Sequence, residues 1–209
     1  MDASYQKKGK GRLGRAWEAD KDESLMFSVL VKDKKLLQNA PKLSLVAGSA
    51  VFKYLQQIGL KNVSIKWPND IYANEKKICG ILLESVSHKK VDAAIIGIGL
   101  NVNQETFPEG FFRTPTSIRL ETGSPMDLRD IKKDLYKIIK EELLLLKEEK
   151  SDYLEVINEN SYLKGKDCYC TYNGEKKEIK VLKVDEDGSL IGIIDGNEKK
   201  IISDEITFE

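Results

Sequence analysis

A short cationic loop is the stretch of this chain best suited to chemistry. Residues 9–17 read Gly-Lys-Gly-Arg-Leu-Gly-Arg-Ala-Trp, so three glycines alternate with three cations. Glycine lets the backbone adopt positive φ angles and approach a ligand closely. Lysine and arginine supply positive charge, and the planar guanidinium fork of arginine matches carboxylate and phosphate groups. The stretch predicts a flexible loop that closes over an anion, and the alternative is an ordinary solvated surface loop.

Two better-known glycine-rich loops do not fit the sequence around it. Gly9, Gly11 and Gly14 match the dinucleotide pattern G-x-G-x-x-G, which requires a helix to begin there. Residues 15–23 are instead polar and lack an apolar face. A kinase loop requires the H-R-D and D-F-G motifs, and neither tripeptide occurs in the chain; the Walker motif is missing as well.

Composition limits the partners. The 209 residues contain 41% hydrophobic and 33% charged residues, which is typical of a soluble globular protein with a core. Lys+Arg and Asp+Glu both number 34, so nothing global indicates nucleic acid or a membrane surface as a partner. The positive charge of the loop is therefore local, which favours a small anionic ligand.

The numbers and spacing of cysteine and histidine argue against a metal site built from these residues. The three cysteines are Cys79, Cys168 and Cys170, and no Cys-x-x-Cys pair occurs. We expect buried or idle thiols, no disulfides and a reducing, cytoplasmic location. His88 is the only histidine and lies in a polar stretch, so we expect neither a zinc site nor a Ser-His-Asp triad.

Hydrophobic periodicity indicates an α/β chain. Apolar residues between Pro41 and Ile58 recur at helical spacing, with Gly59 placed to end that helix. Asp127 suits the N-cap of a second long helix that runs to about Glu149. Strands are expected at 3–6, 24–32, 63–66, 71–73, 78–87 and 92–103, a short helix at 153–158, and an irregular connection at 104–126.

Two details of these strands bear on function. Proline disfavours helix at the residue before it, so strand 63–66 should end at Lys66, just before Trp67-Pro68-Asn69-Asp70. A strand end is a rigid place from which to aim an ammonium group. Gly97 and Gly99 interrupt strand 92–103, which indicates that another group approaches the backbone closely there.

The pattern changes near residues 160–164. Five short strands follow, at 167–172, 177–184, 189–195, 199–203 and 205–208, separated by Asn-Gly and Asp-Gly turns. Five short strands in about 45 residues are typical of a small SH3-like barrel. We therefore expect one domain at 1–162 and a second at 163–209.

Three elements could converge on one site: the cationic loop, Lys66, and the glycine-bearing strand that ends at Asn101. Cations fixed on rigid elements around a flexible cationic loop suit a reaction at phosphate, where catalysis is mostly positioning and charge stabilisation. No activated serine or cysteine nucleophile is evident, so the nucleophiles would come from the substrates.

With these motifs in order, the chain resembles the biotin–protein ligases, also called biotin–[acetyl-CoA-carboxylase] ligases. The segments that carry the resemblance are Gln6 with residues 9–17, then 66–70 (Lys-Trp-Pro-Asn-Asp), 77–84 (Lys-Ile-Cys-Gly-Ile-Leu-Leu-Glu) and 97–103 (Gly-Ile-Gly-Leu-Asn-Val-Asn). The resemblance is specific over residues 3–103 and looser over 127–208. It implies an α/β (α+β) fold of the class II synthetase type, with a mixed, mostly antiparallel sheet packed on helices, followed by the barrel.

The resemblance also implies a two-step reaction. Biotin attacks the α-phosphate of ATP to give biotinyl-5′-AMP and pyrophosphate, with Mg²⁺ assisting, and a lysine of a biotin carboxyl carrier domain then takes the biotinyl group. Lys66 and Arg12 are implied as catalytic residues. The implied biotin and adenylate contacts are Gln6, Lys10, Gly11, Arg12, Arg15, Lys66 and Asn101, with no metal ligand assigned. Trp17 is implied to help fold the loop over the ligand.

The sequence departs from the family pattern in two respects. Lys10 stands where the family usually has arginine, which keeps the charge but loses the fork, so we expect weaker adenylate retention. The family's upstream biotin-binding segment, which carries Ser/Thr and Asn, has no counterpart here, nor has the DNA-binding domain of its repressor-type members. We therefore expect a catalytic domain that lacks its start, with exposed sheet edges that a homodimer could pair.

Two other functions remain open at this point. One is a lipoate or octanoate ligase or transferase of the same superfamily, although the Lys-Trp-Pro-Asn-Asp motif favours biotin. The other is a catalytically inactive, truncated homologue that acts as a binding module. Nucleic-acid binding is weakly supported because the overall charge is balanced.

Overall fold

A six-stranded sheet, a five-stranded sheet, a two-stranded hairpin and a layer of helices make up the described part of the protein. The computed structural model describes residues 1–87, 91–110, 113–166, 168–202 and 206–208. His88, which the sequence placed in a polar turn, lies outside these residues. None of the helices in the described part of the chain is long and apolar enough to cross a lipid bilayer.

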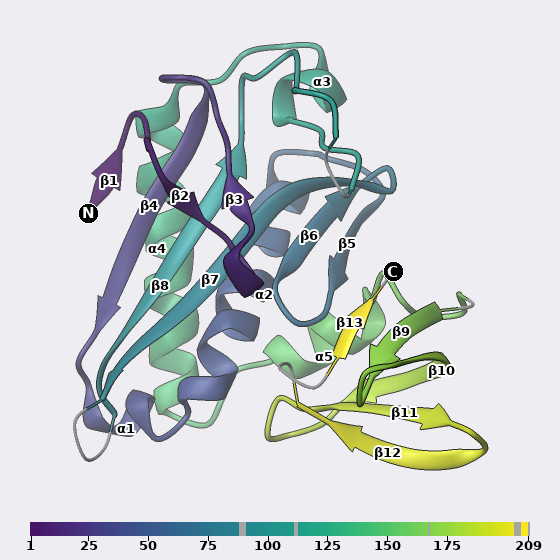
Figure 1. The fold of residues 1–209 in the computed structure, drawn as a ribbon. Coiled ribbons are helices and arrows are strands. Elements are labelled where there is room, and N and C mark those ends of the chain that lie inside the picture. The colour runs from purple at the N-terminus through teal and green to yellow at the C-terminus, as the bar shows by residue number, and fades with distance from the viewer. Residues whose placement is uncertain (88–90, 111–112, 167, 203–205, 209) are drawn as a thin grey trace.

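The larger sheet has six strands in the order β1-β4-β8-β7-β6-β5 (Figure 1). Their bounds are Asp2–Ala3 (β1), Ser24–Val31 (β4), Val63–Lys66 (β5), Asp70–Ala73 (β6), Lys76–Ser87 (β7) and Val91–Asn101 (β8). Every ladder between these strands is antiparallel, and parallel pairing among the described residues is confined to two isolated bridges, Ile65 with Ser161 and Lys77 with Pro115. The expected α/β fold with a mostly antiparallel sheet is therefore confirmed.

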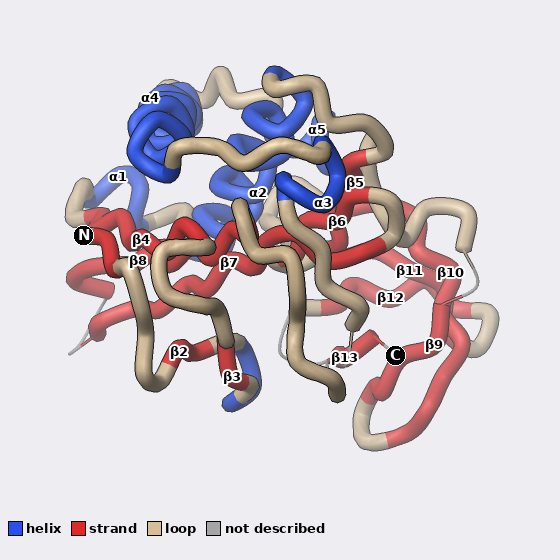
Figure 2. The backbone as a smooth tube through the Cα atoms, turned by 90° about the horizontal axis from the view of Figure 1, so that it is seen from above, coloured by secondary structure: helices blue, strands red, loops and turns tan. Residues whose placement is uncertain are grey.

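The α-helices of the described residues cover one face of this sheet (Figure 2). The helices are Lys34–Leu37 (α1), Ala40–Gln57 (α2), Ile118–Thr122 (α3), Leu128–Lys147 (α4) and Tyr153–Glu159 (α5). The apolar stripe of α2, which includes the fully buried Leu43, Val46 and Leu55, packs in one core with alternate sheet residues such as Ile81 and Ile98. The opposite face of the sheet is left for other elements.

That opposite face carries the cationic loop. The loop folds into a small hairpin, with β2 at Gly9–Lys10 paired to β3 at Ala16–Trp17 around a 3₁₀ turn at Arg12–Gly14 (η1). Figure 2 shows the hairpin and the helices on opposite sides of the sheet. The hairpin is thus free to approach the central strands.

The C-terminal sheet agrees with the expected SH3-like unit. Its five strands are Cys168–Tyr172 (β9), Glu175–Val184 (β10), Leu190–Ile194 (β11), Asn197–Ile201 (β12) and Ile206–Phe208 (β13), in the order β12-β11-β10-β9-β13. Asn173-Gly174 and Asp195-Gly196 form the expected turns, since both residues of each pair have positive φ angles. The division at 162/163 remains a prediction.

Two expectations about local structure were wrong. The strand expected at 3–6 lies at Asp2–Ala3, because only those residues pair with β4, and Ser4, Tyr5 and Gln6 are exposed and belong to no strand. The connection at 104–126 contains α3, for which Ser117 is the N-cap and Gly123 the left-handed C-terminal residue. A further short helix, α1, begins after an N-cap at Asp33.

Candidate active site

A large cavity lies between the hairpin and the helix-free face of the sheet. Its volume is about 880 Å³. The sheet contributes alternate residues of its central strands, including Met26, Gly80, Leu82, Gly97 and Gly99, whose neighbours along each strand point into the helical core. The cavity is therefore built by the pleat of the sheet on one side and the cationic loop on the other.

Positive charge dominates the cavity wall. Eight Lys or Arg residues line it against four Asp or Glu residues, in a chain whose net charge is zero. The cations are Lys7, Lys8, Lys10, Arg12, Arg15, Lys66, Lys77 and Arg113. This imbalance favours an anionic ligand of roughly nucleotide size.

Among the four cations that the sequence singled out (Lys10, Arg12, Arg15 and Lys66), Lys66 is the most deeply buried. It ends β5 as expected, and the residue is only 7% exposed. Its Nζ lies 5.7 Å from the ring centre of Tyr72 and 5.9 Å from that of Tyr162. Burial lowers the pKa of the Lys66 ammonium to about 8, and the charge of Arg113 adds to this effect while Asp70 opposes it.

The residues after Lys66 attach the cationic loop to the sheet. Trp67 and Pro68 are joined by a cis peptide bond, and Asn69 follows. Arg12 Nη1 donates to Asn69 Oδ1 at 3.2 Å, and Asn69 Nδ2 donates to the Ile81 carbonyl oxygen at 2.9 Å. Asn69 therefore links the guanidinium of Arg12 to strand β7.

Lys77 is a site residue that the sequence argument missed. Its Nζ forms an ion pair with Asp70 Oδ1 at 2.7 Å and lies 6.0 Å from the ring centre of Trp17, at the cavity wall. The available signal was its place at the start of segment 77–84, but only the pairing of β6 with β7 brings it to Asp70. Arg113 is a second missed residue, and it comes from the connection that the sequence left irregular.

Trp17 explains the glycines of the central strands. A Cβ atom added at Gly99 would lie 2.5 Å from Trp17 Cε2, and one at Gly80 would lie 3.1 Å from Trp17 Cζ3. The indole therefore rests directly on the sheet backbone, and the expected close approach to β8 is confirmed at Gly99. The contact holds the hairpin against the sheet.

The remaining candidate residues also meet at the cavity. Gln6, Lys10, Gly11 and Arg15 line it from the loop side, where the Gly11 amide donates to the Arg15 carbonyl oxygen at 2.7 Å. Asn101 lines it from the end of β8, is 4% exposed, and donates from Nδ2 to the Thr116 carbonyl oxygen at 2.9 Å. All seven candidate site residues are thus brought to one cavity.

The three cysteines are not among the residues that line the cavity. Cys79, Cys168 and Cys170 are all buried, as expected, and no disulfide joins them. Burial raises the pKa of the Cys79 thiol far above its ordinary value, so that it is a poor nucleophile. Among the described residues, no three His, Cys, Asp or Glu side chains gather as a metal-binding group.

This arrangement can hold two anions together and stabilise charge that develops between them. Such a cavity, on the open face of an antiparallel sheet with helices behind it, suits a reaction between a carboxylate and a nucleotide phosphate, because fixed cations stabilise the charge that develops there. Comparisons with known proteins agree with this chemistry. The pattern of the Biotin/lipoate A/B protein ligase family matches residues 3–101.

Individual relatives are similar over larger or smaller parts of the chain. The bifunctional ligase/repressor BirA of Bacillus spizizenii is 36% identical over 128 residues, which cover 60% of this chain and 39% of that protein. The biotin–[acetyl-CoA-carboxylase] ligase of Mycobacterium tuberculosis is 36% identical over 106 residues, 49% of this chain and 38% of that protein. The structure of the biotin protein ligase from Aquifex aeolicus in complex with biotin and ATP superposes with a TM-score of 0.87 at 33% identity, over 100% of this chain and 87% of that one.

The chain therefore belongs to the biotin/lipoate protein ligase family, and within it to the biotin protein ligases. The matched part spans 39% to 46% of the length of these bifunctional relatives.

Proposed function

We propose that this chain is an ATP-dependent ligase that activates biotin as biotinyl-5′-AMP and transfers the biotinyl group to a lysine of a carrier domain. The observation that carries the proposal is the cavity with twice as many cations as anions on its wall and the buried Lys66 within it. The Aquifex aeolicus protein, which is similar over the whole chain, was solved with biotin and ATP together.

Charge placement supports the first step. A biotin carboxylate oxygen attacks the α-phosphorus of ATP, and the bond to the β-phosphate oxygen breaks to release pyrophosphate. Lys66 and Arg12 offset the charge that builds on the α-phosphoryl oxygens in the transition state. Lys77, on the same wall, adds a third cation that Asp70 holds in place.

The loop residues are proposed to hold the substrates. Gln6, Lys10, Gly11 and Arg15 contact biotin or the adenylate from the hairpin, and Asn101 contacts the adenylate from the sheet. Trp17 orders the hairpin against Gly99 and so excludes water from the mixed anhydride. In the second step the acceptor lysine amine attacks the biotinyl carbonyl carbon, AMP leaves, and the amine loses a proton.

The residues at the cavity suit a Mg²⁺ ion that binds together with ATP and is held partly by its phosphates. The described residues offer no three-ligand acidic cluster, and Mg²⁺ in proteins is often held by one or two carboxylates together with substrate phosphates. Asp70 and Asn101 would be the nearby oxygen ligands, and the ion would neutralise phosphate charge.

The partner proposals rest on the same reasoning. The acceptor is a biotin carboxyl carrier domain of a biotin-dependent carboxylase, and no nucleic acid is involved. Homodimer formation through exposed sheet edges stays a prediction, as does a cytoplasmic location, which the odd number of cysteines and the lack of a Cys-x-x-Cys pair favour.

The test is biotin-dependent exchange of labelled pyrophosphate into ATP by this 209-residue chain. Exchange with biotin supports the proposal, and exchange with lipoate or octanoate but not biotin supports the alternative substrate class. A folded chain that exchanges with none of them would be a binding module. Transfer is then measured as biotin incorporated into a purified carrier domain.

A further inference from the structure

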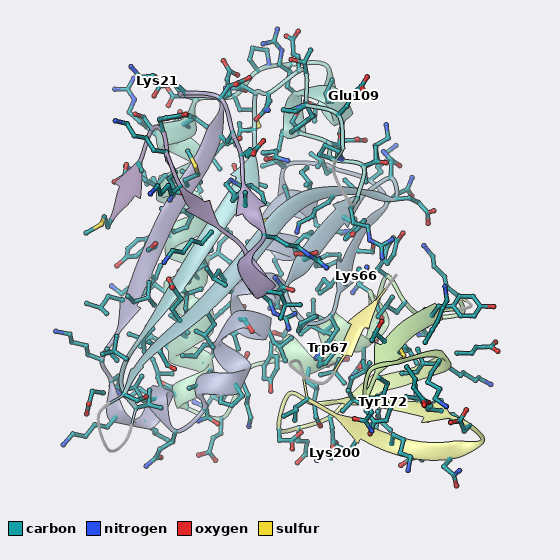
Figure 3. The ribbon with its side chains drawn as sticks, in the orientation of Figure 1. Lys21, Lys66, Trp67, Glu109, Tyr172 and Lys200 are labelled. Carbon is teal, nitrogen blue, oxygen red and sulfur yellow. The ribbon has the colours of Figure 1, made fainter. Side chains whose placement is uncertain are left out.

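Residues 160–162, in the segment that joins the two sheets, run beside the end of β5, where Lys66 lies. Ile65, the neighbour of Lys66 in β5, donates from its amide to the Asn160 carbonyl oxygen and accepts from the Tyr162 amide, both at 2.8 Å. Residues 160–162 thereby extend the outer edge of the large sheet. Figure 3 shows Lys66 and Trp67 at the level where the two sheets meet.

The ring of Tyr162 forms part of the wall around the Lys66 ammonium. It stacks on Tyr72 with the ring centres 4.3 Å apart and the planes tilted by 30°. Lys66 Nζ lies within 6 Å of both ring centres, at 5.7 and 5.9 Å. At this range an aromatic face attracts a cation, and the stacked pair limits where the ammonium can go.

Further contacts hold the residues around Lys66 in place. Lys166 Nζ lies 3.6 Å from the ring centre of Tyr162 and forms an ion pair with Glu75 at the β6–β7 turn. Trp67 Nε1 donates to the Gly188 carbonyl oxygen in the turn between β10 and β11 at 3.0 Å. The C-terminal sheet is thus hydrogen-bonded to the residue that follows Lys66 in the chain.

We propose that Tyr162 is a positioning residue for Lys66. Its ring, held by the segment 160–162 between the two sheets, fixes where the Lys66 ammonium lies relative to the reacting phosphate. The proposal rests on the proposed adenylation. It concerns the face of the ring and not the hydroxyl group, because Lys66 lies over the ring. No motif of the sequence contains Tyr162, which lies 96 positions after Lys66.

The test compares three variants with the wild-type chain in pyrophosphate exchange. Tyr162→Phe keeps the ring and should retain kcat within about twofold. Tyr162→Leu removes the ring and should lower kcat about tenfold or more with little change in KM for ATP and biotin, because misplacing a reacting group affects the transition state. Tyr169→Leu is the matched control: it removes an exposed tyrosine of the C-terminal sheet that also lies by a lysine, Lys176, and kcat should not change.

A readout that needs no activity separates this inference from the proposed function. The rate at which acetic anhydride acylates Lys66, followed by peptide mass spectrometry against pH, reports the pKa of its ammonium. Burial is the main cause of the low pKa, so Tyr162→Leu should admit water and raise it, whereas Tyr162→Phe should not. If Tyr162→Leu is unfolded at the assay temperature, Tyr162→Met takes its place.

The outcomes are distinct. Absence of exchange in the wild-type chain would refute the proposed function, and the acylation profile would still decide whether Tyr162 positions Lys66. An unchanged acylation profile in Tyr162→Leu, an equal loss of kcat in Tyr162→Phe, or a rise in KM at constant kcat would overturn the positioning role.

Discussion

Replacing Lys66 by methionine should stabilise the protein while it abolishes adenylation. Methionine has similar length and no charge, so it suits a side chain that is 7% exposed. Burial lowers the pKa of Lys66 from its ordinary value of 10.5 to about 8. Since one pKa unit corresponds to about 1.4 kcal/mol, burying the ammonium destabilises the folded state at pH 7 by about 3 kcal/mol.

The expected gain in the free energy of unfolding is somewhat smaller. Methionine gives up the attraction of the two tyrosine rings, which offsets part of the gain, so we expect about 1–3 kcal/mol at pH 7. Between the two pKa values the unfolded wild-type chain binds more protons than the folded one, and wild-type stability therefore rises with pH over that window. The advantage of the variant should shrink to about 1 kcal/mol or less at pH 10.

Urea denaturation of both proteins at pH 7 and pH 10 measures this difference. Lys53→Met is the control of opposite sign, because Lys53 pairs with Glu142 and Asp152 at 2.7 and 2.6 Å, which raises its pKa despite partial burial. That control should lose stability at pH 7. A lower free energy of unfolding for Lys66→Met than for wild type at pH 7 would refute the prediction. So would the same gain in that free energy at pH 7 and pH 10, or full pyrophosphate exchange by the variant.

Three further outcomes follow from the site. Gly99→Ala should displace Trp17, because the added carbon would lie 2.5 Å from its ring. Tryptophan fluorescence should then shift to the red, and protease cleavage of the loop should increase. Gly97→Ala is the control and should cause neither change, because its nearest neighbouring atom would lie 3.5 Å away. Asn69→Ala should remove the hydrogen bond from Arg12 Nη1 and weaken adenylate binding about tenfold in calorimetry, whereas unchanged affinity would mean that this hydrogen bond does not contribute to binding. Binding of an anionic ligand at pH 8.5 should take up protons, because the anion raises the lowered pKa of the buried lysine ammonium again; calorimetry in buffers of different ionisation enthalpy measures this, and equal heats in all buffers would contradict it.

Local structure was predictable where short-range chemistry decides it. Asp127 accepts a hydrogen bond from the Arg129 amide at the start of α4, as an N-cap residue should. Asn173 and Gly174 make the β9–β10 turn, both with positive φ angles. The short helix α3 was missed although Ser117 and Gly123 mark its ends, because its five residues are too few to show a period.

The sequence by itself singled out seven of the residues that line the cavity, since the glycine loop, Lys66 and Asn101 lie in short, ordered motifs, but it did not single out Lys77 or Arg113. Tertiary structure alone decided the environment of Lys66. Its pKa depends on burial and on Arg113, and its aromatic wall includes Tyr162 from the junction between the two sheets. Burial and through-space charge depend on distances between segments far apart in the chain, and a sequence pattern records only what lies within a few residues.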